Sequence, residues 1–216
     1  MDSLRLDRRT AAFLIGVPVA WAVLLLFHPM GDGTNIYADL NDKVTVWMVV
    51  HTGSLFLIPL MALAIYLLVR DLPGTAARVA RWAAPVFAVF YASWETVAGL
   101  VEGALVQHAS GPQVEGALQA LHDHWAVGDF GLLNAIGSLA WITAAIAAAV
   151  AVRKAGAPLP AAVLLGLSGM ASAHPPPFGP IGLACFAVGI VLIYRSQTAE
   201  AARPVPPTPP AVGARA

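Results

Sequence analysis

The sequence predicts an all-α integral membrane protein, a bundle of about six transmembrane helices with both termini cytoplasmic. Three observations indicate this fold: an apolar composition, several long apolar runs and a one-sided distribution of basic residues. Of the 216 residues, 58% are hydrophobic and 11% are charged, and the mean hydropathy is +0.73. Values of this kind are typical of chains with several segments in lipid rather than of soluble domains.

The N-terminal part of the chain predicts two membrane spans. The first is expected at residues 11–27, after an arginine-rich start. Because no small-residue cleavage site follows Phe27, a retained span is favoured over a secretory signal. A polar segment at 29–43 leads to the second expected span, residues 44–69, which is long enough to cross a bilayer with some tilt.

The third apolar segment, residues 83–108, carries two acidic residues, Glu95 and Glu102. Seven residues of an α-helix return almost to the starting direction, so both carboxylates are predicted on one face. A carboxylate in hydrocarbon costs about 2.5 kcal/mol or more, which predicts that this face points into the bundle or a wet cavity. A protonated pair that only hydrogen-bonds neighbouring helices is the alternative.

Polar residues also enter the next predicted elements. Residues 113–123 have the apolar spacing of a short helix at the membrane surface. A fourth span is expected at 126–152, with Asp129 and Asn134 in its first half. These two side chains would therefore lie in the same half of the bilayer as the Glu-bearing helix.

The C-terminal part predicts two shorter, Gly-rich spans at residues 159–173 and 178–194. Together with the first four spans they form one predicted transmembrane domain, residues 1–195. Residues 196–216 are rich in Pro and Ala without an apolar pattern, and this composition predicts a disordered cytoplasmic tail.

The distribution of basic residues predicts the orientation. With a cytoplasmic N-terminus and six spans, eleven of the twelve Lys and Arg residues fall on the cytoplasmic side, and only Lys43 lies outside. The positive-inside rule favours this topology, with segments 29–43 and 109–125 on the outer side. We therefore expect a multi-pass protein of the cell membrane whose polar pocket faces outward.

The same topology gathers the histidines toward the outer side. His51 is expected about 10 Å below the outer boundary, with Glu102 at a similar depth and Glu95 nearer the midplane. The other five histidines are expected at the outer ends of spans or in outer loops: His28, His108, His122, His124 and His174.

A metal site is one hypothesis for this polar cluster. Imidazole and carboxylate suit zinc and iron when thiolates are absent, and Cys185 is the single cysteine. His51 and Glu102 would form the core of the site, closed from above by some of four further histidines, namely His28, His122, His124 and His174. No established histidine motif supports the site, and a haem held between histidines of two spans is an alternative cofactor.

The sequence is also compatible with functions that need no metal. Burial favours the protonated form of a carboxyl, so Glu95 or Glu102 could act as a general acid on a lipid or isoprenoid. Asp129 and Asn134 are the remaining catalytic candidates. A proton- or cation-coupled transporter and a structural membrane subunit are further possibilities.

The expected partners follow from the environment and the charge. A membrane lipid or a small apolar molecule is the expected ligand of a pocket within the bilayer. Equal numbers of basic and acidic residues give a formal net charge of zero, which argues against nucleic acid. A homo-oligomer or a larger membrane complex is compatible with the sequence.

Overall fold

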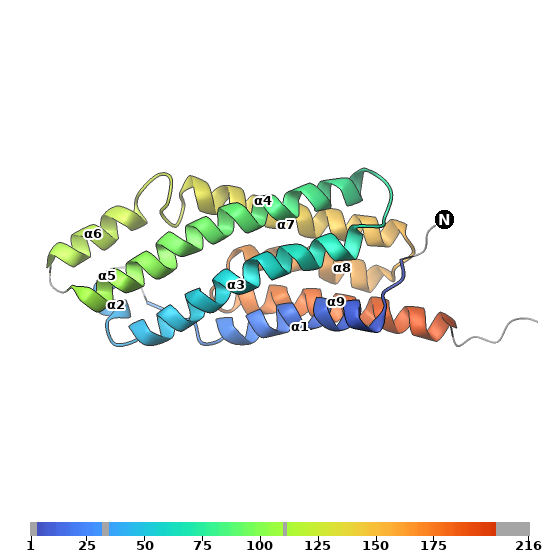
Figure 1. Cartoon of the computed structure of the whole chain (residues 1–216), viewed down its shortest axis with the longest axis horizontal. Helices are drawn as coiled ribbons and strands as arrows, with labels where there is room; N and C mark the ends of the chain where they lie inside the picture. The colour runs from blue at the N-terminus through green and yellow to red at the C-terminus, as the bar shows by residue number, and fades with distance from the viewer. Residues whose placement is uncertain (1–3, 32–34, 110–111, 202–216) are drawn as a thin grey trace, which may run out of the picture.

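The computed structural model describes residues 4–31, 35–109 and 112–201, and within these ranges every regular element is a helix. The helices lie roughly along one axis and form an elongated bundle (Figure 1). The elements in order are α1 (Arg8–Leu25), α2 (Ile36–Leu40), α3 (Val44–Val69), α4 (Thr75–Glu95), the π-helix η1 (Thr96–Val101), α5 (Glu102–His108), α6 (Pro112–His122), α7 (Leu132–Lys154), α8 (Leu159–Leu167), the 3₁₀-helix η2 (Ser168–Ser172) and α9 (Phe178–Ala201).

Five of the helical segments described are long and apolar enough to cross a membrane. They are Arg8–Leu25, Val44–Val69, Thr75–His108, Leu132–Lys154 and Phe178–Ala201. The expected span near 159–173 is instead a shorter apolar segment, Leu159–Ser172, in which α8 continues into η2. The all-helical fold with several membrane-compatible helices is thus confirmed.

The start of α7 and the end of α9 differ from the predicted boundaries. α7 begins at Leu132 rather than near residue 126, because a turn with Gly128 and Gly131 precedes it. A Cβ at Gly131 would approach backbone atoms of Gly128 to within 2.8–2.9 Å, so this turn needs glycine. Asp129 therefore lies in the turn and not in the helix. At the other end of the chain, α9 extends to Ala201, six residues past the expected domain boundary, and residues 202–216 lie outside the described part.

The Glu-bearing helix is longer than expected and contains a π-turn. It runs from Thr75 to His108, and Thr96–Val101 form η1 between the two glutamates. A π-turn inserts residues relative to the α-helical repeat, so it changes the direction in which later side chains point. The π-turn therefore shifts the helical phase between Glu95 and Glu102, and both side chains are buried.

Small residues bring α4 and α7 close together. Ala77, Ala80 and Ala84 of α4 are fully buried, as is Ala144 of α7. A Cβ at Gly137 would meet the backbone of Tyr91 at 2.8–2.9 Å, so the two helices are in direct contact there. Helices in lipid associate by such close van der Waals packing, because lipid chains offer no hydrophobic driving force.

α1 packs beside α9 at the other side of the bundle, and side-chain hydrogen bonds fix the ends of these helices. Gln197 accepts from the Leu6 backbone N–H at 3.0 Å and donates to the Leu4 carbonyl at 2.7 Å. Asp7 caps α1 by accepting from the backbone N–H groups of Arg9 and Thr10. The first described residues are therefore attached to the last helix.

A small separate cap covers the end opposite the N-terminus. Its core consists of Ile36, Leu40, Val106, Val114 and Leu118, from α2, α5 and α6. The Glu115 carboxylate accepts hydrogen bonds from the backbone N–H groups of Ile36 and Tyr37, at 3.2 and 2.9 Å. A side chain of α6 thereby accepts from the free backbone N–H groups at the N-terminus of α2 and joins these two helices of the cap.

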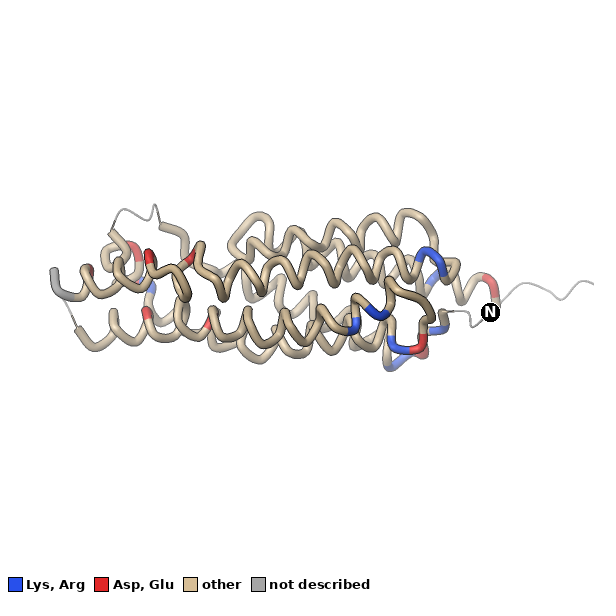
Figure 2. The backbone as a smooth tube through the Cα atoms, turned by 90° about the horizontal axis from the view of Figure 1, so that it is seen from above, with Lys and Arg blue, Asp and Glu red and all other residues tan. Residues whose placement is uncertain are grey.

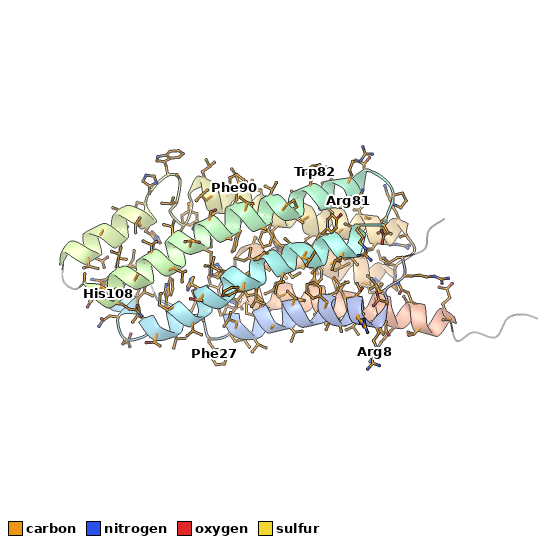
Figure 3. The ribbon with its side chains drawn as sticks, in the orientation of Figure 1. Arg8, Phe27, Arg81, Trp82, Phe90 and His108 are labelled. Atoms are coloured by element: carbon orange, nitrogen blue, oxygen red, sulfur yellow. The ribbon has the colours of Figure 1, made fainter. Side chains whose placement is uncertain are left out.

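Charged residues are divided between the two ends of the molecule. Lys and Arg gather at the end that carries the N-terminus, and acidic residues are concentrated toward the cap (Figure 2). Arg8 and Phe27 mark opposite ends of the α1 segment, and Arg81 and His108 lie toward opposite ends of the long Glu-bearing helix (Figure 3). Arg81 is not free, because it donates to the carbonyls of Val69, Arg70 and Leu72 at the end of α3.

Candidate metal centre

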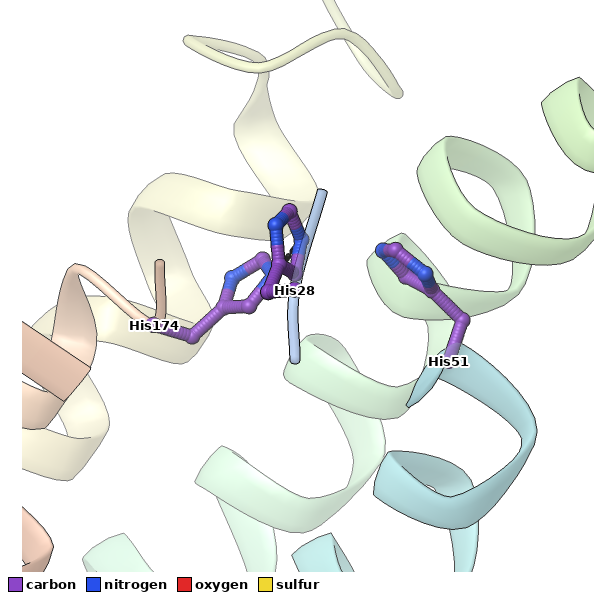
Figure 4. Close-up of side chains that lie close together, drawn as sticks. All are labelled: His28, His51 and His174. Atoms are coloured by element: carbon purple, nitrogen blue, oxygen red, sulfur yellow. Dashed lines mark hydrogen bonds between the residues drawn. The ribbon is translucent and has the colours of Figure 1, made fainter. Parts of the chain in front are cut away.

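Three histidines from distant parts of the chain converge below the cap. His28 follows α1, His51 lies in the second turn of α3, and His174 lies between η2 and α9. One ring nitrogen of each lies within 4.8 Å of the others, and the side chains point toward one another (Figure 4). We call this group the His cluster. Its residues are buried, with exposed fractions of 9% for His28, 1% for His51 and 5% for His174.

His51 is held by its own helix and by the π-turn. Its Nδ1 lies 2.8 Å from the carbonyl of Trp47, one turn earlier, and the two rings are 4.0 Å apart. The Trp47 indole N–H donates to the Gly99 carbonyl at 2.7 Å. A Cβ at Gly99 would overlap the His51 ring, so only glycine leaves room for the imidazole. The π-turn thus positions this histidine, and π-turns often occur at functional sites.

His28 is oriented by the backbone next to it. Its Nδ1 lies 2.8 Å from the carbonyl of Pro29. A carbonyl oxygen can only accept, so this nitrogen carries the proton and Nε2 has a free lone pair. The same argument applies to His51 and the carbonyl of Trp47.

His174 is oriented by Tyr91. The tyrosine hydroxyl donates to the carbonyl of Ser172 at 3.1 Å and lies 3.2 Å from Nδ1 of His174. Because the Ser172 carbonyl takes the hydroxyl proton, the tyrosine oxygen accepts from the His174 Nδ1–H. His174 therefore also presents an unprotonated Nε2.

The unprotonated nitrogens face one another. Nε2 of His174 lies 3.2 Å from Nε2 of His28. Two nitrogen lone pairs at this distance repel unless a proton or a metal cation lies between them. In a tetrahedral zinc site with Zn–N bonds of about 2.0–2.1 Å, two ligand nitrogens are about 3.3 Å apart. The observed separation is close to that of two ligands of one metal ion.

The environment favours neutral imidazoles, the form that binds metal. Burial lowers the pKa of His28, an effect that the hydrogen bond to Pro29 opposes. Burial also lowers the pKa of His174 well below its usual value, and the neighbouring His28 and His51 lower it further.

A pocket of about 330 Å³ opens above the His cluster. All three histidines line it, together with residues of the cap and of the turn before α7. The polar residues among its other lining residues are Asp39, Glu102, His122, Asp129, Asn134 and Ser172, and its apolar walls include Ile36, Leu40, Trp47, Trp94, Ala98 and Phe130.

Glu102 lines this pocket but does not belong to the His cluster. It is 5% exposed and makes no hydrogen bond or ion pair with the residues that the structure describes. Gly99 packs on His51, whereas Gly103 packs on Trp47 and Met48, so Glu102 lies nearer the cap than His51 does. The predicted His51–Glu102 pair at one depth is replaced by a histidine cluster with the carboxyl above it.

Glu95 lies away from the lining of this pocket. It is 1% exposed and has Ser54 as a hydrogen-bond partner, while its Oε1 has no partner among the described residues. The Ser54 hydroxyl also accepts from the indole N–H of Trp21 at 3.0 Å. The two predicted catalytic glutamates are therefore separated, one in the helix packing and one at the pocket.

Asp129, Asn134 and His122 meet at the rim of the pocket. Asp129 Oδ2 lies 3.5 Å from Nδ1 of His122, and the Asn134 side chain donates to the Asp129 carbonyl. Burial raises the pKa of the Asp129 carboxyl, and the nearby His122 opposes this effect. These residues surround the pocket entrance without joining the His cluster.

The other two histidines lie apart from this group. His124 is exposed, stacks on Trp125 and accepts from the Ala126 backbone N–H. His108 is exposed at the end of α5. Of the six predicted ligands, the structure thus brings three together, places Glu102 and His122 on the same pocket, and leaves His124 outside.

Sequence reasoning missed the residues that orient the histidines. Trp47, Tyr91 and Gly99 look like ordinary residues of membrane helices. Their contacts with the histidines depend on the helix packing and on the π-turn, which no spacing in the sequence indicates. The His-Pro pairs at residues 28–29 and 174–175 do place two of the histidines at helix ends.

No family model, curated protein or solved structure matches the chain.

Proposed function

We propose that this protein is a membrane metalloprotein in which His28, His51 and His174 bind one divalent transition metal ion. The single observation that supports this most strongly is the 3.2 Å approach of the His28 and His174 Nε2 atoms. The partners of their Nδ1 atoms favour the tautomers that leave both Nε2 lone pairs free. The partners that hold the Nδ1 atoms are of the kind that fix metal-binding histidines in known centres.

The arrangement suits zinc or iron bound by three histidines with an open position. A tetrahedral metal ion held by the three imidazoles would keep one position for water or substrate. Zinc lowers the pKa of a bound water to about 7, which supplies a nucleophile at neutral pH. A metal-dependent enzyme acting on a lipid or a small apolar molecule is therefore the favoured activity.

The His cluster could also exist without a metal ion, but only with a different hydrogen bond from Tyr91. If the Tyr91 hydroxyl donated to His174 instead of Ser172, His174 Nε2–H could donate to His28. The Ser172 carbonyl would then lose its hydrogen bond from Tyr91. In that case the buried carboxyls Glu95 and Glu102 would be the groups left for acid–base chemistry or for proton-coupled transport.

The protein is proposed to span the cell membrane six times, with cytoplasmic termini and an outward-facing pocket. The α8–η2 segment has nine and five residues, which gives a length of about 24 Å, close to a bilayer core of about 30 Å. It brings His174 to the end of α1, so α9 can return toward the basic end. The basic residues at that end support a cytoplasmic location.

On this topology the His cluster lies at the outer edge of the hydrocarbon. His51 precedes the inner end of α3 at Val69 by eighteen residues, or about 27 Å. Glu102 follows Gly99, which contacts the His51 ring, by three residues, or about 4.5 Å, and would lie at the same edge slightly nearer the cap. This depth supports a site that water and membrane-bound molecules can both reach.

Elemental analysis and an optical spectrum of the detergent-purified protein test the proposal. We expect one zinc or iron ion per chain without a Soret band, because the cavity offers ligands for a single ion. Alanine variants of His28, His51 and His174 should each lose the metal, whereas His124→Ala, a control at an exposed histidine, should retain it. A metal-free native protein, or full metal content in all three variants, would refute the metal site.

A further inference from the structure

We propose that the pocket above the His cluster binds the positively charged amino group of an amphiphilic molecule, with Glu102 and Asp129 as counter-charges. This proposal rests on the proposed function and deepens it, because it names a ligand class for the same pocket.

The described Asp, Glu, Lys and Arg residues that line the pocket are all acidic. Three carboxyl residues line it, namely Asp39, Glu102 and Asp129, and none of the lining residues that the structure describes is Lys or Arg. A phosphate or carboxylate ligand would face these carboxyl groups, with the proposed metal ion as its one cationic partner in the described lining. A cationic group instead finds complementary charge, which favours its entry and its orientation.

Glu102 is the buried carboxyl residue of the pocket without a hydrogen-bond partner among the described residues. Its exposed fraction is 5%, and it lines the pocket. It has no hydrogen bond or ion pair with another residue in the described ranges. A buried carboxyl is normally either protonated, paired or bound to a cation, so a bound ammonium group would favour its ionised form. An ammonium group seated above the His cluster would supply the missing partner.

The remaining walls fit an organic ammonium group with an apolar chain. Trp47 and Trp94 line the pocket beside the His cluster, and Phe130 lies fully exposed at its edge. Aromatic faces attract ammonium groups, and carboxylates add charge complementarity. A volume of about 330 Å³ holds a polar group and part of a chain, the rest of which can follow the apolar outer surface.

A second metal ion fits this part of the pocket less well. The His cluster is the one group of three or more candidate ligands within 4.8 Å among the described residues. Carboxylates bind zinc at about 2.0–2.2 Å, so Glu102, Asp129 and His122 would have to move together first. An ammonium group is larger than a zinc ion and donates longer hydrogen bonds, so its partners can be more widely spaced.

Binding measurements in phosphatidylcholine nanodiscs test the proposal. The probes are dodecylamine, dodecanol and dodecanoate, which share one chain length, and binding is followed by tryptophan fluorescence with empty nanodiscs as a partition control. Each titration uses metal-loaded and chelator-treated protein, because dodecanoate and the neutral form of dodecylamine can both bind the metal directly. We expect dodecylamine to bind at least about tenfold more tightly than dodecanol, with dodecanoate weakest in the chelated protein.

The variants separate a cation-binding role from a metal-binding one. Glu102→Gln should lose the preference for the amine and keep its metal, because Gln retains the shape without the charge. Glu200→Gln, at the exposed end of α9, is the matched control and should keep the preference.

Three outcomes would overturn the proposal: equal or tighter binding of dodecanoate to chelated protein, an unchanged amine preference in Glu102→Gln, or loss of a metal ion in that variant. Absence of metal from the native protein would refute the proposed function instead. The amine preference of chelated protein is measured independently of that result.

Discussion

At the scale of single residues, the three histidines are ordered by hydrogen bonds at their Nδ1 atoms. Two donate from Nδ1 to backbone carbonyls, and the third is joined to Tyr91. Each contact fixes the ring and leaves Nε2 free for a ligand. Tyr91 is the one side chain among these partners, and it can be changed without altering the backbone.

Replacing Tyr91 with Phe should weaken metal binding about 10- to 100-fold, the usual effect of removing such a partner. The phenyl ring keeps the contacts with Phe87 and Trp94, at 5.3 and 5.2 Å between ring centroids, so the fold should be retained. Competition with a chelator of known affinity gives the ratio. Tyr66→Phe, a half-exposed position far from the site, is the control. Equal affinities in the Tyr91 variant and the native protein would remove Tyr91 from the site.

At the scale of elements, the π-turn decides which parts of the Glu-bearing helix face the site. It places Gly99 against the His51 ring and its carbonyl on the Trp47 indole. Because the turn changes the helical phase, Glu102 lines the pocket and Glu95 packs beside Ser54. One irregular turn thus separates two carboxylates that the sequence spacing places together.

Gly99→Ala tests this arrangement. In a regular exposed helix the change from Gly to Ala stabilises by about 0.8–1 kcal/mol. Here the added methyl group would overlap the His51 ring, and overpacking costs about 1–3 kcal/mol.

We therefore expect lower metal affinity and a lower melting temperature for this variant. Gly16→Ala is the matched control, since its Cβ meets nothing within 4 Å, and it should not lose stability. A more stable Gly99→Ala protein with native metal affinity would contradict the contact with His51.

These elements also show what the sequence can and cannot predict. Long apolar runs are direct signals, so the sequence predicts a span at residues 44–69, and α3 covers Val44–Val69. Apolar periodicity does not indicate local packing or glycine turns. The π-turn, the late start of α7 and the change from α8 to η2 depend on these features and were not predicted. His28, His51 and His174 were among the predicted ligands, yet their grouping arises only when α1, α3 and the η2–α9 connection pack together.

At the scale of the whole molecule, the fold joins a bundle with a basic end to a cap over the acidic end. The His cluster lies where the bundle meets the cap, and residues of both line the pocket. If the basic end is cytoplasmic, the cap and pocket lie on the outer side, where a membrane-bound ligand can reach them.

A reporter fusion tests this orientation. Fusions that are active only in the cytoplasm should work after Ala201 and after Gly156, which precedes α8, and should fail after Ala109, near the cap. This pattern is expected because Lys and Arg are retained on the cytoplasmic side. An active cytoplasmic reporter after Ala109 with inactive ones at the other two sites would invert the proposed topology.

X-ray absorption at the edge of the metal found by elemental analysis tests the central proposal most directly. For zinc we predict a first shell that includes three imidazole nitrogens at about 2.0–2.1 Å, with the outer scattering of imidazole rings. The fourth ligand should be a light atom from water or substrate. A first shell of oxygen ligands without imidazole scattering, or one containing sulfur, would contradict a centre built from His28, His51 and His174.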